Sequence, residues 1–440
     1  MSEQEPLEPR AWLDAHVNLE TGIGVPAPAR ERGAPTLERI GALLQYLGSP
    51  QLEYPAVHLT GTNGKTSATR MVTELLSTVG LVVGTTTSPH LERVNERMTI
   101  NGEPITDADL DEQLRVVALV EREIGLDPSY FEVVIAAAFR WFADVAIDVA
   151  AVEVGLGGTW DATNVIDGRV AVVTNVSVDH VAYLGSTHAE IATEKAGIVK
   201  PGSTLVLGET DPDLVPIFME RGAARVLRRD VDFGVRSNVP AFGGRMLDLY
   251  TPDARYPDVF VPLYGAHQGD NAAVALAAAE AFVGTPLDPE AVRGAFARVQ
   301  SPGRLELVGR HPLVLLDGAH NVAGAEALRH ALTEEFAPAA RTLVVGLLRE
   351  KEPHDMLRAL GLDDVEQLVC ARPPNARALD PVLIARAAVE LGFPEERIEV
   401  VDSVADAVSS ALLTTPADGE IVITGSLYFV GAARGILVDD

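Results

Sequence analysis

Short apolar runs alternate with longer helix-like runs along most of this chain, and this alternation limits the possible folds more than any other feature. A β-like run at 55–61 precedes a helical pattern at 65–80, and another β-like run begins at Leu81. The order recurs at 131–145, which has a helical pattern, and at 147–155, which is β-like. Such βαβ units join parallel strands by right-handed crossovers. The sequence therefore predicts an α/β fold with a mainly parallel sheet.

A break in this pattern near residue 300 divides the chain. At 440 residues the chain is too long for one ordinary core, and Ser-Pro-Gly at 301–303 interrupts a helical pattern before the alternation restarts. We expect an N-terminal α/β domain over residues 1–300 and a smaller C-terminal Rossmann-like α/β domain over residues 301–440. Residues 230–263 carry short β-like pieces separated by glycine and proline, which predicts an antiparallel insertion.

Composition limits the partners. The formal net charge is −28, so we expect no nucleic-acid partner. No apolar run is long enough to span a bilayer and the acidic first ten residues do not resemble a signal peptide, so we expect no membrane partner. The single cysteine, Cys370, is typical of a reducing cytoplasm. We expect a cytoplasmic protein that acts as a monomer.

A glycine-rich turn follows the first β-like run and begins the next helix. It reads HLTGTNGKTS over residues 58–67 and departs from the G-x-x-x-x-G-K-[ST] pattern, because Leu59 stands where the first glycine is expected. Backbone N–H groups and the helix dipole at such a turn attract phosphate. Lys65 would reach the outer phosphates, and Thr66 has the hydroxyl position that usually serves Mg²⁺. This predicts a nucleotide site and an N-terminal domain with the fold of a P-loop ATPase domain. The turn alone leaves the activities of a kinase, an ATPase and a ligase open.

Other polar residues follow the predicted strands, at the edge where parallel sheets bind ligands. Ser88 begins an SPH turn, and Glu153 ends a strand where a carboxylate can hold Mg²⁺ or cap a loop. His180 alone is more typical of a loop histidine than of a metal ligand. Lys195 is either a surface lysine paired with Glu194 or a lysine held near metal and phosphate.

The order of these segments resembles the Mur ligase superfamily, and within it the folylpolyglutamate and dihydrofolate synthases. The blocks GTNGK, SPHL, EVGLGG, DATN, EKAGI, SPGRLE, DGAHN and GSLYFVG occur together between about residue 60 and residue 431. The family's loop lacks the first Walker glycine, which accounts for Leu59. The resemblance implies a ligase that uses ATP and Mg²⁺ and adds L-glutamate to dihydropteroate, to a reduced folate, or to both, through an acyl phosphate.

The resemblance also implies residue roles. Lys65, Lys195 and His320 are implied to be catalytic, with Lys195 carrying an N-carboxylate. Trp160 stands where family members differ, and either a pterin-facing role or simple packing is open for it. The residues implied to hold Mg²⁺ are Ser88, Glu153 and His180. The residues implied to bind ATP are Thr62, Asn63, Gly64, Lys65, Thr66, Asn271, Arg304 and Asp317.

Two alternatives stay open. A peptidoglycan Mur ligase normally has a separate UDP-binding domain before the loop, whereas only about 60 residues precede Gly61 here. A nucleotide-binding regulator without ligase activity is disfavoured by Glu153, Lys195 and the DGAHN block. The sequence does not decide between dihydrofolate synthesis, folate extension and both.

Overall fold

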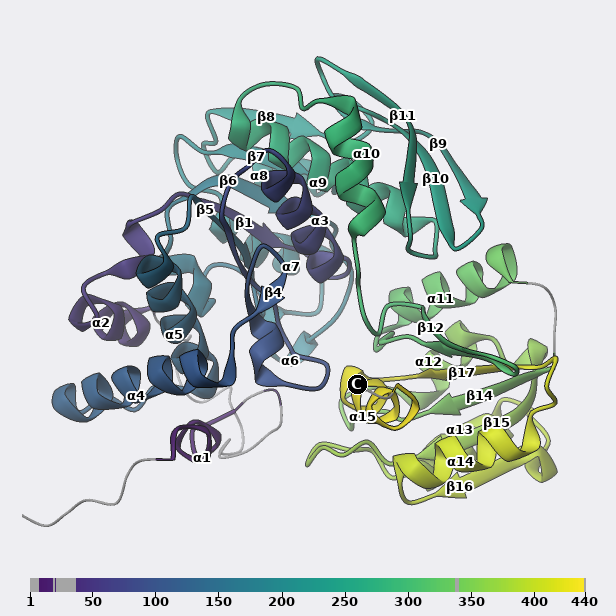
Figure 1. Cartoon of the computed structure of the whole chain (residues 1–440). Coiled ribbons are helices and arrows are strands. Elements are labelled where there is room, and N and C mark those ends of the chain that lie inside the picture. The colour runs from purple at the N-terminus through teal and green to yellow at the C-terminus, as the bar shows by residue number, and fades with distance from the viewer. Residues whose placement is uncertain (1–7, 19, 21–36, 337–339, 439–440) are drawn as a thin grey trace, which may run out of the picture.

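The computed structural model describes residues 8–18, 20, 37–336 and 340–438, which form two α/β parts and a small antiparallel sheet (Figure 1). One connection leads from α10 (Pro289–Arg298) in the first part to β12 (Glu306–Arg310) in the second. The boundary expected near residue 300 falls in this connection and remains our proposal. None of the described helices is long and apolar enough to cross a membrane. Residues 1–7, part of the segment compared with a signal peptide, lie outside the described residues.

The first part is built on an eight-stranded sheet of order β4-β3-β2-β5-β1-β6-β7-β8. Its strands run parallel except β3 and β4, which extend one edge as antiparallel strands. The predicted mainly parallel sheet is therefore confirmed, and the SPH turn leads into these two edge strands. The strands are β1 Ala56–Thr60, β2 Val83–Thr86, β3 Met98–Ile100, β4 Glu103–Pro104, β5 Val149–Glu153, β6 Gly168–Val173, β7 Thr204–Leu207 and β8 Arg225–Arg228.

Helices cover both faces of this sheet. Alternate strand residues enter different cores: Val57 of β1 packs in the cluster that includes α3 and α9, whereas Ala56 packs in the cluster that includes α4 and α5. Burial on both faces explains why these strands are continuous apolar runs. The helices of this part are α1 Pro9–Asp14, α2 Glu38–Tyr46, α3 Lys65–Thr78, α4 Asp107–Ile124, α5 Tyr130–Val145, α6 Val181–Leu184, α7 His188–Lys195, α8 Val215–Met219, α9 His267–Val283 and α10.

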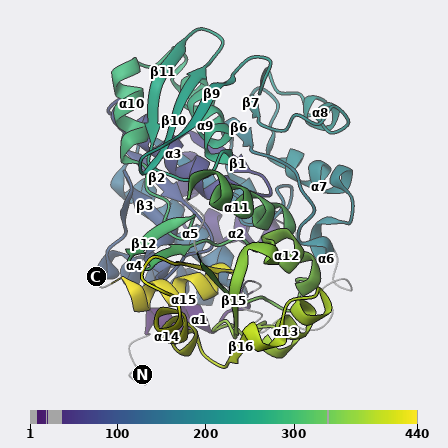
Figure 2. The ribbon, with the colours of Figure 1, turned by 90° about the vertical axis from the view of Figure 1, so that its right-hand side faces the viewer.

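The predicted antiparallel insertion is also confirmed. Strands β9 (Gly234–Ala241), β10 (Gly244–Tyr250) and β11 (Arg255–Val261) form a three-stranded antiparallel sheet. Its buried side chains join the core that contains α9 and α10. Figure 2 shows this sheet above α11 (Val322–Glu335), which belongs to the second part. Arg245 of β10 is buried and donates to Glu334 at 3.0 Å, so the insertion contacts both parts.

The second part has a six-stranded sheet of order β12-β13-β17-β14-β15-β16, parallel except for β12. One face packs on α11, α12 and α13, and the other on α14 and α15. This agrees with the predicted Rossmann-like unit. The remaining elements are β13 Leu313–Leu316, α12 Pro353–Leu360, β14 Arg341–Val345, β15 Val365–Ala371, α13 Pro381–Glu390, β16 Ile398–Val401, α14 Val404–Thr414, β17 Glu420–Thr424 and α15 Leu427–Leu437.

Candidate active site

The glycine-rich turn connects β1 to α3, as predicted. Gly64 is the N-cap of α3 with a φ of +80°, a conformation that favours glycine. A Cβ built there would lie 2.3 Å from Oδ1 of Asn271 in α9, and one built on Gly61 would lie 1.8 Å from Oγ1 of Thr174, just after β6. The turn is therefore pressed against two neighbouring elements. Both glycines are needed for this close approach.

Two lysines meet on one carbonyl oxygen of the turn. Lys65 donates from Nζ to Gly61 O at 3.0 Å, and Lys195 donates to the same oxygen at 2.8 Å. Lys195 is only 3% exposed, so the surface-lysine interpretation is wrong. Burial lowers the pKa of both lysines, that of Lys195 well below its ordinary value. The space around Gly61 O, which we call the lysine-rich corner, is suited to an anion. It is also suited to chemistry that needs a neutral amine.

Glu153 lies at the carboxyl end of β5, directly beside the strand that carries the turn. It is 1% exposed and accepts from Thr66 Oγ1 at 2.9 Å and from Ser88 N at 3.3 Å. Burial raises the pKa of Glu153, and the charge of Lys65 opposes that rise. The buried carboxylate and the nearby hydroxyls form an oxygen-rich set that fits Mg²⁺. Among the described residues no three His, Cys, Asp or Glu side chains form a group that could hold a metal ion.

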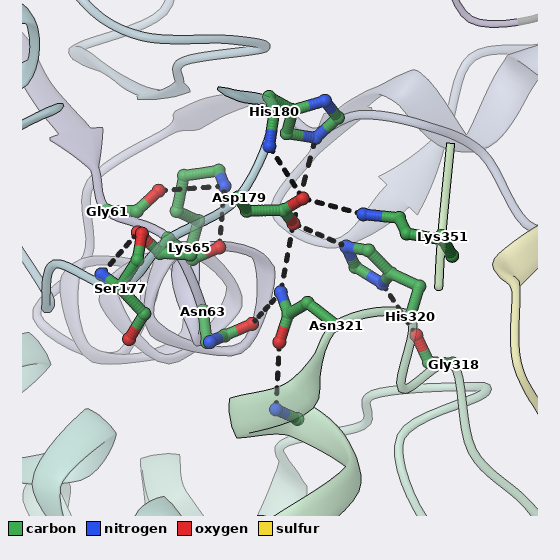
Figure 3. A network of polar contacts seen from close by, with 12 residues as sticks. Gly61, Asn63, Lys65, Ser177, Asp179, His180, Gly318, His320, Asn321 and Lys351 are labelled. Atoms are coloured by element: carbon green, nitrogen blue, oxygen red, sulfur yellow. Dashed lines mark hydrogen bonds and ion pairs between the residues drawn. The ribbon is translucent and has the colours of Figure 1, made fainter. Parts of the chain in front are cut away.

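Asp179 is the centre of a polar network that joins the two parts (Figure 3). Its Oδ1 accepts from Lys351 Nζ at 2.6 Å, and its Oδ2 accepts from Asn321 Nδ2 at 3.0 Å. Nε2 of His320 lies 3.6 Å from Oδ2, and Nε2 of His180 lies 3.9 Å from it. Burial acts to raise the pKa of Asp179, but His180, His320 and Lys351 hold it well below its usual range. One carboxylate of the first part therefore gathers three side chains of the second.

Both histidines of this network are neutral near pH 7. Burial lowers the pKa of His180 and of His320 to about 4. His320 Nδ1 lies 2.8 Å from Gly318 O, and a neutral ring must carry its proton there to donate to this carbonyl. Nε2 of His320 therefore keeps its lone pair. A neutral imidazole can accept a proton or a metal, which an imidazolium cannot.

A second cavity adjoins the first between α9 and the second part. Asn271 and Asp317 line it, and Arg304 lines both cavities. Asp317 accepts from the backbone N–H groups of Leu305 and Ala319, both at 2.8 Å. Burial raises the pKa of Asp317, and the charge of Arg304 opposes this. This cavity offers amide, carboxylate and guanidinium groups beyond the lysine-rich corner.

The predicted site residues gather closely, with one exception. Trp160 lines neither cavity and is half-buried against the core beside α7, which favours packing and leaves a substrate role as a prediction. Asn271 and Asp317 line the second cavity. Those lining the first cavity are Thr62, Asn63, Gly64, Lys65, Thr66, Ser88, Glu153, His180, Lys195, Arg304 and His320.

Three residues of the network were not predicted: Asp179, Asn321 and Lys351. Asp179 stands next to His180, and Asn321 ends the DGAHN block, so both were within recognised motifs. Lys351 had one signal. Only four of the 35 basic residues are lysines, and three of these, Lys65, Lys195 and Lys351, belong to this site. Because arginine does not replace the compact ammonium of lysine, a lysine in an arginine-rich chain is a signal that its position needs this group.

A P-loop domain and a second α/β domain that close on one lysine-rich cavity define a nucleotide-dependent ligase of the Mur type. The family profile described as the Mur ligase middle domain matches residues 59–279, and that described as the Mur ligase, glutamate ligase domain matches residues 303–427. The chain belongs to the Mur ligase family, and the resemblance found in its motifs is confirmed.

Named relatives place the chain more narrowly. It is 41% identical over 443 residues to a dihydrofolate synthase/folylpolyglutamate synthase of Mycobacterium tuberculosis, covering 92% of this chain and 91% of the relative. A solved folylpolyglutamate synthase of that organism, complexed with ADP and AMPPCP, has a TM-score of 0.87 at 42% identity and covers 92% of this chain and 96% of its own. An Escherichia coli structure in complex with DHPP and ADP has a TM-score of 0.84 at 28% identity, with 97% of each chain covered. The predicted ATP-dependent ligase class is confirmed.

Proposed function

We propose that this protein adds L-glutamate to dihydropteroate, to a reduced folate, or to both, with ATP as the energy source. One observation carries the proposal: the loop residue Lys65, the buried Glu153 and Lys195, and the second-domain residues Arg304 and His320 all line one cavity. The names of the relatives and their ADP and DHPP complexes support the substrate classes. We further propose a cytoplasmic monomer without nucleic-acid or membrane partners.

The reaction needs an activated carboxylate, because a free carboxylate is a poor electrophile. A carboxylate oxygen of the pterin substrate attacks the γ-phosphorus of ATP, the bond to the bridging oxygen breaks, and ADP leaves. The amine of glutamate then attacks the acyl carbon, phosphate leaves and the amine loses a proton. Lys65, beside the loop, is placed to spread the negative charge that develops on the phosphoryl group.

The nucleotide is proposed to span the two cavities. Thr62, Asn63, Gly64, Lys65 and Thr66 would hold its phosphates at the N-terminus of α3. The residues proposed for the nucleoside side are Asn271, Arg304 and Asp317.

The oxygen-rich set at the end of β5 is proposed to hold Mg²⁺. Ser88, Glu153 and His180 would be its protein ligands, and all three line the first cavity. When bound, Mg²⁺ would neutralise phosphate charge, and it usually shares its shell with phosphate oxygens and water. A set of three protein ligands would leave coordination positions for those oxygens.

Lys195 is proposed to be N-carboxylated in the active enzyme. Its amine is buried and its pKa is well below the ordinary value because of desolvation, so the neutral amine that attacks CO₂ is available. Attack by the neutral amine forms an N–C bond and releases one proton, which leaves a carbamate anion in place of the amine. His320, with a free Nε2, is proposed to act on the phosphates or on the incoming amine. Trp160 is retained only as a candidate contact to the pterin.

The position at which ATP is cleaved tests the proposal. With dihydropteroate or a reduced folate carrying ¹⁸O in its carboxylate, the enzyme should form ADP, and the label should appear in the released phosphate. The reason is that Lys65 and Glu153 flank the loop, where the outer phosphates are expected. Label in AMP, or no turnover that depends on a pterin acceptor, would contradict the acyl-phosphate route and the substrate class respectively.

A further inference from the structure

The turn that carries Ser88 reaches across to the second domain. Leu91, three residues further on, packs with the core cluster formed by β13, β17 and α15, although it belongs to the first domain. A Cβ built on Gly303, in the connection between the domains, would lie 3.1 Å from Leu91 Cδ1. A partly buried hydrophobic residue of one domain thus packs against the other domain's core.

A missing side chain makes room for this turn. Gly431 lies within α15, and a Cβ built on it would lie 1.9 Å from the carbonyl oxygen of Leu91. Glycine inside a helix is unfavourable compared with alanine, so its position here needs a packing reason. The close approach of Leu91 provides that reason. We call this place the Gly431 notch.

An ion-pair cluster fixes the same contact from one side. Arg434, one turn further along α15, donates from Nη1 to Glu92 at 2.7 Å and from Nε to Glu306 at 3.1 Å. Glu306 in turn accepts from Gly303 N at 2.8 Å. Arg434 of α15 therefore bridges Glu92, the residue after Leu91, to Glu306, which in turn holds Gly303 of the interdomain connection.

The turn itself is internally braced. The carboxylate of Glu96 accepts from the backbone N–H groups of Leu91 at 2.7 Å, Glu92 at 2.9 Å and Arg93 at 2.7 Å. Three such bonds to one carboxylate resist local bending. Glu96 therefore holds the segment from Leu91 to Arg93 as one unit.

The other end of the turn lies in the cavity. Ser88 and Pro89 line it, and Ser88 N donates to Glu153 Oε2 at 3.3 Å. Only two residues separate Ser88 from Leu91 along the chain. His90, between them, accepts from Arg97 Nε at 2.7 Å, so one short, held stretch of chain links the position of α15 to the position of Ser88.

We propose that seating of Leu91 in the Gly431 notch is the contact through which the docked second domain positions Ser88 beside Glu153. Leu91 and Gly431 are then positioning residues for the ligation, although neither touches the reacting atoms. The inference rests on the proposed function, since Ser88 and Glu153 matter there as ligands of Mg²⁺. It also explains why the GSLYFVG block ends in glycine.

Gly431→Ala tests the notch, and α15 offers a matched control. Gly435 lies on the same helix, and a Cβ built there meets no atom within 4 Å. Gly435→Ala should leave kcat, KM for ATP and Mg²⁺ dependence at wild-type values. Gly431→Ala should lower kcat by about tenfold or more, because small misplacements of a reacting group are costly, and should raise the Mg²⁺ concentration for half-maximal rate. KM for ATP should stay within about twofold, because the loop at 61–66 is untouched.

A second variant keeps the test decisive if Gly431→Ala does not fold. Leu91→Ala removes the inserted side chain without altering α15, and should shift kcat and Mg²⁺ dependence in the same direction. The proposal is overturned if the variant that folds, Gly431→Ala or Leu91→Ala, has the kcat and Mg²⁺ dependence of wild type. It is also overturned if Gly435→Ala loses as much kcat as Gly431→Ala. The Mg²⁺ dependence of ATP-analogue binding is measured in parallel. If wild type shows no acceptor-dependent turnover the proposed function fails, while this binding still reports whether the notch positions Ser88.

Discussion

Single residues in this site carry charges that burial makes costly. Lys195 and Glu153 are almost fully buried, and the pKa of the first is lowered and that of the second raised by desolvation. Such shifts are expected where groups await a charged ligand, because burial alone destabilises both ionised forms. The ligand proposed for Glu153 is a hard cation, which gives a direct test.

Glu153→Gln should weaken Mg²⁺-dependent turnover more than nucleotide binding. A carboxamide keeps the shape and can still accept from Thr66, but it lacks the charge that Mg²⁺ prefers. We expect a loss of about 10- to 100-fold in apparent Mg²⁺ affinity, measured from rates over a Mg²⁺ titration. Glu209→Gln is the matched control, because Glu209 follows β7 in the same sheet but lines neither cavity. An unchanged titration curve for Glu153→Gln would remove this residue from the metal site.

At the scale of elements, strand β1 leads into the glycine-rich turn and carries a buried titratable side chain, His58. His58 is fully buried, and its Nε2 lies 2.9 Å from Oγ1 of Thr163, which itself donates to Asp161. Nε2 must therefore be the protonated nitrogen, and Nδ1 has no hydrogen-bond partner among the described residues. Burial lowers the pKa of His58 to about 3. Protonation of His58 at low pH should therefore destabilise strand β1.

The free energy of unfolding should fall as the pH drops below the ordinary histidine pKa of 6.5. In that range the unfolded chain binds a proton at His58 and the folded chain does not, so stability is lost towards pH 3. His58→Gln keeps a donor for Thr163 and removes the titration. Between about pH 7 and pH 5 wild type should lose about 2 kcal/mol more than this variant, measured by denaturant unfolding. Parallel pH profiles for the two proteins would contradict the assignment.

At the scale of the whole molecule, the active site is complete only where the two domains meet. Asp179 of the first domain accepts from Lys351 and Asn321 of the second, and Arg434 of the second domain donates to Glu92 of the first. Removing one member of a buried pair leaves a charge that is costly to keep buried. Domain docking should therefore depend on Lys351.

Lys351→Met should weaken docking while leaving each domain folded. It keeps the aliphatic stem but leaves Asp179 without its ammonium partner, a loss of about 1–3 kcal/mol. We expect a lower kcat and a larger radius of gyration by small-angle scattering. Lys200→Met is the control, since Lys200 lines neither cavity and its hydrogen bond to Asn164 O, at 3.5 Å, lies within the first domain. Equal scattering and kcat for the two variants would show that Asp179 and Lys351 do not hold the domains together.

The sequence by itself determined the class of fold and most of the site. Strand and helix periods are local properties, so the parallel sheets, the antiparallel insertion at 230–263 and the helix after the glycine-rich turn were all predictable. The motifs also placed Lys65 and Glu153 in one site, because residues that follow parallel strands share one sheet edge, whereas His320 follows a strand of the other sheet and was placed there only by the family resemblance.

Only the tertiary structure decided which residues of the two domains contact each other and which are buried. No local pattern shows that Lys351 reaches Asp179, that Lys195 is buried rather than exposed, or that Gly431 makes room for Leu91. These facts depend on contacts between residues far apart in the sequence, and a side chain's burial is set by what packs over it. The periods of single elements carry no information about that packing, so the sequence shows which groups are present and the fold decides which of them meet.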